Sequence, residues 1–240
     1  MKKIICSMAF MAFIAGVMPA GAQKKVSINV STELMGDENK TISVAKDSKG
    51  YMTLFDGKTF TGWRGYGKGH VPARWTIENG CLKFNAGQGE GGDIIFAHQF
   101  KNFVFEVEWK ISEGGNSGIF YLAQESASVG QDGKLHAEPI YISCPECQVL
   151  DNERHPDAKL GAVLGIRQSS SLYDMIPAKP QNSKPYGQWN HIKIVCDNGH
   201  VEHWQNGVKV VQYDLWTPAW TELLQKSKFS QEKWPAAFNL

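Results

Sequence analysis

Hydrophobic and polar residues alternate along several short segments of this chain. In the longest, every odd position from Phe103 to Ile111 is hydrophobic, whereas Glu106, Glu108 and Lys110 occupy even positions. Successive side chains of a strand point to opposite faces, so this pattern predicts a β-strand with one buried face. Shorter strand-like segments are 75–78, 81–84, 93–96, 117–123, 191–196, 200–205 and 208–213.

Turn residues separate these segments. Asn79-Gly80, Asp197-Asn198-Gly199 and Asn206-Gly207 each lie between two predicted strands, as is typical of tight β-hairpins. Only Pro218–Lys228 has a helical pattern. Many short strands without alternating helices predict an all-β antiparallel sandwich or barrel with one short C-terminal helix.

The N-terminus has the pattern of a secretory leader. Lys2 and Lys3 precede an apolar run from Ile4 to Val17, and Ala20-Gly21-Ala22 offers a cleavage site. The run is shorter than the roughly 20 residues that a membrane helix needs. We therefore expect residues 1–22 to be a cleaved signal peptide, and the protein to be periplasmic or secreted. Cys6 lies inside the apolar run, which argues against a lipoprotein anchor.

The remaining chain divides into a polar N-terminal extension, residues 23–50, and one domain, residues 51–240. Cleavage would remove Lys2 and Lys3 from the 25 basic residues, leaving 23 against 24 acidic ones. A net charge near zero gives no electrostatic reason to expect a nucleic acid or an acidic membrane as partner. It suits a neutral substrate better.

Four cysteines remain after the leader: Cys81, Cys144, Cys147 and Cys196. Cys144-Pro-Glu-Cys147 has C-x-x-C spacing, but strand-favouring residues surround it and no second such pair completes a zinc site. These cysteines are therefore interpreted as inert thiols or as a local structural disulfide.

Five motifs, in order along the chain, resemble the 3-keto-disaccharide hydrolase family. They are the segments 54–63 (LFDGKTFTGW), 106–121 (EVEWKISEGGNSGIFY), 146–158 (ECQVLDNERHPDA), 172–174 (LYD) with 189–190 (WN), and 201–211 (VEHWQNGVKVV). Family members usually continue into a Gly-x-Ile-x-Leu-Gln-Asp-His-Gly segment and a strand with Arg-Asn-Ile, which this sequence does not contain. An incomplete sequence is the simpler explanation of that difference.

The resemblance implies a concanavalin-like β-sandwich, or jelly roll, with the sugar site on a concave sheet. It also implies an exported bacterial hydrolase that cleaves 3-keto-glycosides. A ketone at C3 acidifies the hydrogen on C2, so a base can form an enolate that expels the group on C1, and water then adds. Such a site needs a base, a donor or cation for the enolate oxygen and an acid for the leaving oxygen.

The third motif supplies the first catalytic candidates. Glu146 and Gln148 lie two residues apart on a predicted strand, so both point to one face. That face is either the concave one or an ordinary solvated one. Asp151 and His155 follow in the adjoining loop, as a proton acceptor or as ligands of a divalent cation. Tyr173 is a candidate proton donor, or simply a strand end.

Substrate-binding candidates come from the other motifs. Besides Gln148 they are Glu108, Asn116, Trp63, Arg64 and Trp204, chosen as polar groups or as aromatic rings that can stack on a sugar. Each also has an ordinary structural interpretation. No cofactor is implied with certainty, and a divalent cation at Asp151 and His155 is one option. Without a dinucleotide-binding fingerprint, the sugar must be oxidised by another enzyme.

Two other functions remain open. One is a non-catalytic, lectin-like carbohydrate-binding sandwich, because fold does not determine function. The other is an ordinary endo-glucanase that uses Glu106 and Glu108 as its pair of carboxylates.

Overall fold

The computed structural model describes residues 3–6 and 46–230 of the chain. Its strands are β1 (Lys3–Cys6), β2 (Trp63–Gly65), β3 (Trp75–Glu78), β4 (Cys81–Phe84), β5 (Ile94–Phe96), β6 (Phe103–Ile111), β7 (Asn116–Phe120), β8 (Ala127–Val129), β9 (Leu135–Ala137), β10 (Glu146–Leu150), β11 (Asn190–Asp197), β12 (His200–Gln205) and β13 (Val208–Asp214). Helix α2 spans Pro218–Lys226, and two short 3-10 helices span Ile140–Ile142 and Pro156–Lys159.

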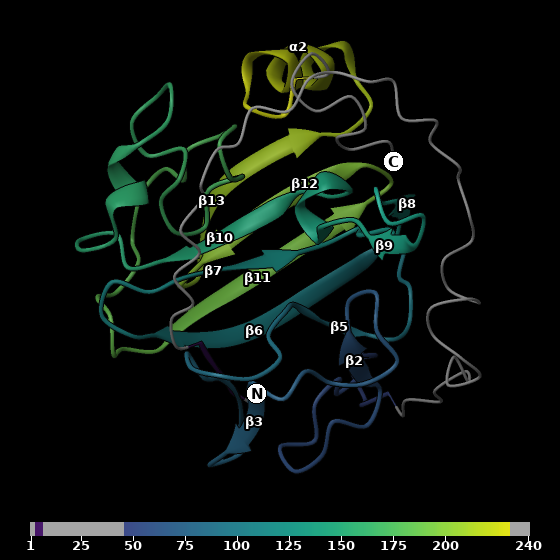
Figure 1. Cartoon of the computed structure of the whole chain (residues 1–240). Helices are drawn as coiled ribbons and strands as arrows, with labels where there is room; N and C mark the ends of the chain where they lie inside the picture. Colours follow the sequence, from purple (N-terminus) through teal and green to yellow (C-terminus); the bar gives the residue numbers. More distant parts are fainter. Residues whose placement is uncertain (1–2, 7–45, 231–240) are drawn as a thin grey trace.

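One layer is a seven-stranded sheet with the order β13-β12-β11-β6-β1-β4-β3 (Figure 1). The hairpins that build it turn at the predicted Asn-Gly pairs. Asn206 and Gly207 have φ values of 48° and 84°, and Asn79 and Gly80 have 52° and 72°. Positive φ at both central residues matches the twist of the flanking strands, which explains why these residue types occupy the turns.

The second layer contains β7 and β10, which pair antiparallel and lie across the large sheet in Figure 1. Leu172 extends it through a bridge to Cys147. The core between the layers contains Trp109, Ile192 and Ile194 from the large sheet, packed with Cys147 and Val149 of β10. Because side chains alternate, the neighbours Glu146 and Gln148 point away from this core.

The predicted all-β sandwich is confirmed. Each strand predicted from alternation is present within three residues of its expected bounds, and the predicted helix is α2. Thr217 caps α2 by accepting a hydrogen bond from the Trp220 N–H at 3.2 Å. Strands β2, β8 and β9, each of three residues, are not predicted.

Strand β1 differs from expectation in two ways. It pairs parallel with both β4 and β6, whereas the predicted sheet is antiparallel. It also belongs to the segment interpreted as a leader, so the structure includes in the sheet four residues that the sequence predicts to be removed. Cleavage stays a prediction. Most of the predicted extension, residues 23–45, lies outside the described residues.

The four cysteines beyond the predicted leader are buried free thiols. Burial raises the pKa of Cys144 and Cys147 well above the ordinary value, which makes both thiols poor nucleophiles. The structure therefore supports the interpretation as inert thiols rather than that as a local disulfide. Within the described residues, no helix combines the length and the hydrophobicity that crossing a membrane requires.

Candidate active site

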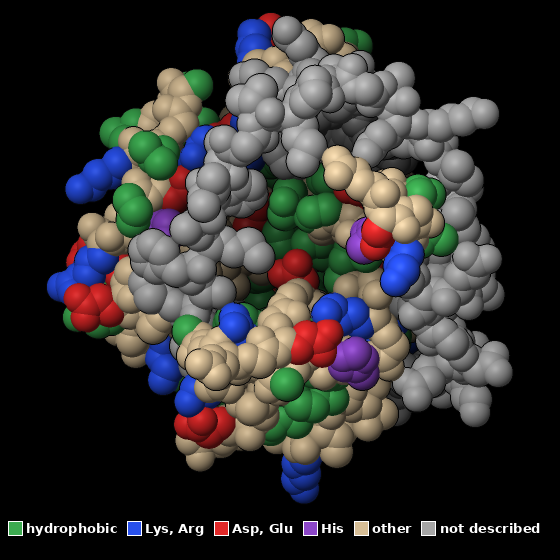
Figure 2. Space-filling model, viewed as in Figure 1, with side chains coloured by type: hydrophobic (Ala, Val, Ile, Leu, Met, Phe, Trp, Pro, Cys, Tyr) green, Lys and Arg blue, Asp and Glu red, His purple; other side chains and the backbone are tan. Residues whose placement is uncertain are grey.

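A cleft opens over the face of β7 and β10 that points away from the large sheet. Figure 2 shows a hollow there, with hydrophobic and acidic side chains at its floor. Its lining includes Glu146, Gln148 and Asn116 from the β7–β10 layer, together with Tyr173 and Lys228. Segments far apart in sequence therefore meet at one concave surface.

Glu146 is the central acidic group of this cleft. It begins β10, and its side chain is half-buried. Gly118 of β7 makes room for it, since a Cβ at Gly118 would lie 2.0 Å from Glu146 Oε1. No described residue forms a hydrogen bond or ion pair with the carboxyl group. Its pKa is raised to about 8, mainly by desolvation; the charge of Lys228 opposes the shift, and the charges of Asp93 and Asp157 add to it. Glu146 is therefore mostly protonated at neutral pH.

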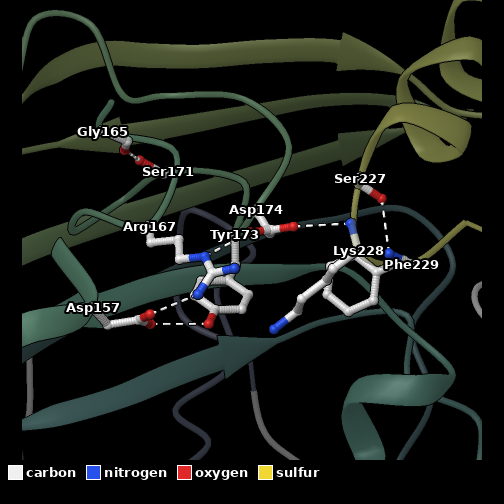
Figure 3. A network of polar contacts seen from close by, with 9 residues as sticks. All are labelled: Asp157, Gly165, Arg167, Ser171, Tyr173, Asp174, Ser227, Lys228 and Phe229. Carbon is white, nitrogen blue, oxygen red and sulfur yellow. Dashed lines mark hydrogen bonds and ion pairs between the residues drawn. The ribbon is translucent and has the colours of Figure 1, made fainter. Parts of the chain in front are cut away.

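A network of ionic hydrogen bonds forms one wall beside Glu146 (Figure 3). Arg167 donates from Nη1 to Asp157 Oδ1 at 2.8 Å and from Nε to Asp174 Oδ1 at 2.6 Å. The Tyr173 hydroxyl donates to Asp157 Oδ2 at 2.9 Å, and the Lys228 N–H donates to Asp174 Oδ2 at 2.9 Å. Because these bonds join the 157–174 segment to Lys228, two residues after the end of α2, they fix Tyr173 and Lys228 relative to each other.

Lys228 brings a cation to this wall. Its Nζ lies 4.1 Å from the centre of the Tyr173 ring and 5.0 Å from that of Phe229. Figure 3 shows its side chain extending beside the Tyr173 ring. Burial lowers the pKa of Lys228, while the charges of Asp174, Glu146 and Asp157 act in the opposite direction. Its ammonium group makes no ion pair within 4.0 Å among the described residues, so it is available to an oxygen of a ligand.

The structure places Tyr173 in the cleft but separates Asp151 and His155 from its lining. Burial raises the pKa of Tyr173, and its proton is already shared with Asp157, so the phenol is a weak acid. The Asp151 carboxylate accepts backbone N–H groups of Gly114 at 2.7 Å and Glu153 at 3.2 Å.

His155 is committed to the local fold. Its Nδ1 accepts the Asp157 N–H at 3.1 Å, which caps the 3-10 helix Pro156–Lys159. Within residues 3–6 and 46–230, no cluster of three or more His, Cys, Asp or Glu side chains could hold a metal ion. The predicted cation site at Asp151 and His155 is therefore not assembled, because both side chains serve turns.

Gln148 and Asn116 line the cleft, as the alternation along their strands allows. Gln148 is 1% exposed, and its Oε1 accepts the Val149 N–H at 2.8 Å. Asn116 is half-buried opposite Leu150 in the β7–β10 ladder.

Trp63 and Arg64 line another part of the cleft from β2. The Trp63 Nε1–H donates to the Leu54 carbonyl at 2.7 Å, and its ring packs edge-on against Phe96. Arg64 is buried and forms two hydrogen bonds to Glu125, at 2.7 and 2.8 Å. The Arg64 charge is therefore neutralised within the fold, and both contacts give these residues a structural role.

Glu108 and Trp204 do not line the cleft. Their neighbours Val107 and Trp109, and His203 and Gln205, are buried, so both side chains point to the outward face of the large sheet. Trp204 lies under the Lys193 ammonium, 3.9 Å from the ring centre. The structure therefore does not bring these two predicted substrate-binding residues to the candidate site.

Sequence reasoning missed Arg167 and Lys228 and gave no role to Asp157 and Asp174. Asp157 belongs to the third family motif and Asp174 to the fourth, so motif membership was an available signal for both. Arg167 lies in a segment without periodicity or family motif, and Lys228 is the last residue of the predicted helix, outside every family motif. The sequence held no signal that would have placed them here.

Comparison with known proteins shows the family of this chain. Residues 50–236 match the 3-keto-alpha-glucoside-1,2-lyase-like domain. A 3-keto-disaccharide hydrolase from Bacteroides thetaiotaomicron is 54% identical over 258 aligned residues, covering 100% of this chain and 89% of the relative. The crystal structure of a proposed glycosyl hydrolase from Parabacteroides distasonis superposes with a TM-score of 0.66 and 27% identity, covering 86% of this chain and 87% of the other. The chain therefore belongs to the family of 3-keto-alpha-glucoside-1,2-lyase-like domains.

Proposed function

We propose that this protein hydrolyses the glycosidic bond of 3-keto-glycosides through removal of the C2 proton, elimination of the C1 substituent and addition of water. The observation that carries this proposal is Glu146: a carboxyl group in a cleft, without a hydrogen-bond or ion-pair partner among residues 3–6 and 46–230, and with its pKa raised to about 8. The 54% identical 3-keto-disaccharide hydrolase supports the substrate class.

Glu146 takes the role of the acid. When the C1–O bond breaks, the departing oxygen needs a proton, and a carboxyl group that is still protonated at neutral pH can supply it. Glu146 then becomes a carboxylate and can remove a proton from the water that adds to C1. Burial raises the pKa of such a carboxyl group, so that it stays protonated and can act as an acid.

Lys228 stabilises the enolate. Negative charge develops on the C3 oxygen when the C2 proton leaves, and an ammonium group without an ion-pair partner favours that charge, particularly in a partly desolvated cleft. Tyr173, held by Asp157, positions Lys228 through the contact between the ring and the ammonium group.

Export to the periplasm or the medium is part of the proposal and is supported by the pattern of residues 1–22. Cell fractionation with N-terminal sequencing of the recovered protein tests it. A chain that starts at Gln23 outside the cytoplasm supports export, and a cytoplasmic chain that still carries residues 1–22 contradicts it.

The activity is tested by incubating the purified protein with a 3-keto-disaccharide in D₂O and following free sugar by NMR. Elimination followed by hydration places deuterium at C2 of the released keto-sugar, whereas direct displacement at C1 leaves the C2 hydrogen in place. Free 3-keto-glucose incubated with and without the protein corrects for exchange after release.

Two outcomes contradict the proposal. Binding of the keto-disaccharide without turnover indicates a lectin-like module. Turnover of the unoxidised disaccharide at an equal rate indicates an ordinary glycosidase, which needs two carboxylates on either side of the bond rather than a ketone.

A further inference from the structure

In the proposed reaction, Glu146 is the acid and Lys228 is the cation. The base that removes the C2 proton is not yet assigned. Five acidic residues line the cleft within the described ranges: Asp47, Asp93, Glu106, Glu125 and Glu146. Three of them are occupied. Asp47 accepts backbone N–H groups of Lys49 and Tyr51, Glu106 accepts the Tyr51 hydroxyl, and Glu125 binds Arg64.

Asp93 is different from these three. In the described part of the chain, its carboxylate accepts a hydrogen bond only from its own backbone N–H. Asp93 lies immediately before β5, and its carbonyl accepts the Tyr66 N–H at 2.9 Å, which anchors the backbone. It is thus a fixed acidic group whose oxygens are free to contact a ligand.

The fold also brings Asp93 near Glu146. Ile95, two residues after Asp93, packs against the buried cluster of Tyr66, Ile140 and Cys144, and Phe120 packs on the same cluster. Phe120 is the direct partner of Glu146 in the β7–β10 ladder. The two carboxyl groups therefore approach the cleft from different elements that share one small core.

We propose that Asp93 is the catalytic base that removes the C2 hydrogen of the keto-sugar, opposite in role to Glu146. This assignment rests on the proposed function. The Asp93 carboxylate takes the C2 proton, and the C–H electrons form the C2=C3 bond of the enolate. The enolate then re-forms the ketone while C1=C2 forms and C1–O breaks, and the departing oxygen takes the Glu146 proton.

The return steps balance this sequence. Water adds to C1 and gives a proton to Glu146, while Asp93 exchanges its proton with solvent and delivers a proton to C2, so both groups regain their starting states. The electrostatics support this division. The charge of Asp93 raises the pKa of Glu146, so the Glu146 carboxyl keeps the proton and Asp93 stays ionised. Asp93 is exposed to solvent where it lines the cleft, and desolvation by the surrounding protein raises its pKa as well.

The test separates proton removal from loss of the C1 group. The probe is 1,5-anhydro-3-keto-glucitol, which has a C2 hydrogen but no leaving group, and NMR in D₂O follows its C2 exchange. Asp93→Asn should slow this exchange by about 10³-fold, within the range of a general base. Glu146→Gln should keep the exchange but slow hydrolysis of the 3-keto-disaccharide far more than that of a 4-nitrophenyl 3-keto-glycoside, whose leaving group needs no acid.

Glu90→Gln is the matched control, because Glu90 is in the same loop, pairs with Lys68 and His70 and does not line the cleft. His98→Gln tests the one histidine among the described cleft-lining residues. If Asp93→Asn fails to fold, Asp93→Glu retains a carboxylate and should exchange at an intermediate rate. The assignment of Asp93 is overturned if folded Asp93→Asn exchanges C2 as fast as Glu90→Gln, or if His98→Gln loses the exchange instead. In either case, hydrolysis by the wild-type protein would still support the proposed function. A wild-type protein that neither exchanges nor hydrolyses overturns both.

Discussion

Two strands of this sandwich carry polar pairs with the same spacing and different environments. Glu106 and Glu108 alternate on β6, and Glu146 and Gln148 alternate on β10. Glu106 accepts the Tyr51 hydroxyl at 2.9 Å and lies 3.2 Å from His191 Nε2. Glu146 has no such partner among the described residues, and its pKa is raised to about 8.

The difference comes from what covers each face. Glu106 lies on the outward face of the large sheet, where the cleft lining extends to Tyr51 and neighbouring polar groups stabilise its charge. The polar face of β10 is the floor of a cleft, where protein atoms displace water and leave the carboxyl group unpaired. Alternation identifies residues that share a face, but the packing of the second layer decides which face becomes reactive.

The largest expected effect is on catalysis by the two carboxyl groups. Glu146→Gln removes the acid and should lower kcat/KM for the 3-keto-disaccharide by about 10³-fold. Glu106→Gln should stay within about threefold of wild type, because its group is satisfied by neighbours. Steady-state kinetics with melting temperatures as folding controls measure both. Equal losses in the two variants would break the contrast between the faces.

A smaller effect is expected for the cations on the two faces. Lys228→Met removes the ammonium group of the cleft and should lower kcat by about 10²-fold. Lys110→Met, on the outward face against Trp189, should have little effect. Because Lys228 lowers the pKa of Glu146, its loss should also move the alkaline limb of the pH–rate profile to higher pH. A limb that stays in place would argue against contact between these charges.

The space beside Glu146 can be filled to sharpen the comparison further. Gly118→Ala places a methyl group where Glu146 Oε1 lies and should displace the carboxyl, lowering kcat by about tenfold. Gly87→Ala is the control, since a Cβ there meets no atom within 4 Å. Crystal structures and steady-state kinetics of both variants show whether the decrease in kcat accompanies displacement of the Glu146 carboxyl group.

The smallest effect concerns stability. The folded-state pKa of Glu146 is about 8, against 4.5 for the free group, so its contribution favours folding at low pH and is lost as pH rises through 8. Glu146→Gln should therefore melt a few degrees higher than wild type at pH 9 and similarly at pH 4. Glu106→Gln is the matched variant on the other strand. Thermal melts across this range measure the difference.

Local pattern predicted much of the fold. Asn-Gly pairs define hairpins by their own backbone preferences, and the alternation of 103–111 gives β6 without knowledge of the partner strands. The same rule placed Glu146 and Gln148 on one face. Asp151 and His155 show its limit, because a side chain that caps a turn and one that meets a substrate have the same appearance in sequence.

Other parts of the site depend on tertiary contacts alone. Arg167 has its place because Asp157 and Asp174 come together around it, and Lys228 because Asp174 holds the backbone after α2. Asp93 lies at the start of a three-residue strand. None of these positions repeats with a period, so no local pattern could have indicated that they meet at Glu146.

Strand β1 has a consequence for how the protein can be handled. Lys3–Cys6 is the only described segment that joins β4 to β6, so the large sheet is continuous through four residues near the N-terminus. Any processing or tag that withdraws these residues leaves two rows of backbone N–H and C=O groups without partners, and open strand edges of this kind recruit other chains. Recombinant versions that begin after the predicted leader should therefore be checked for self-association before their activity is compared with that of the whole chain.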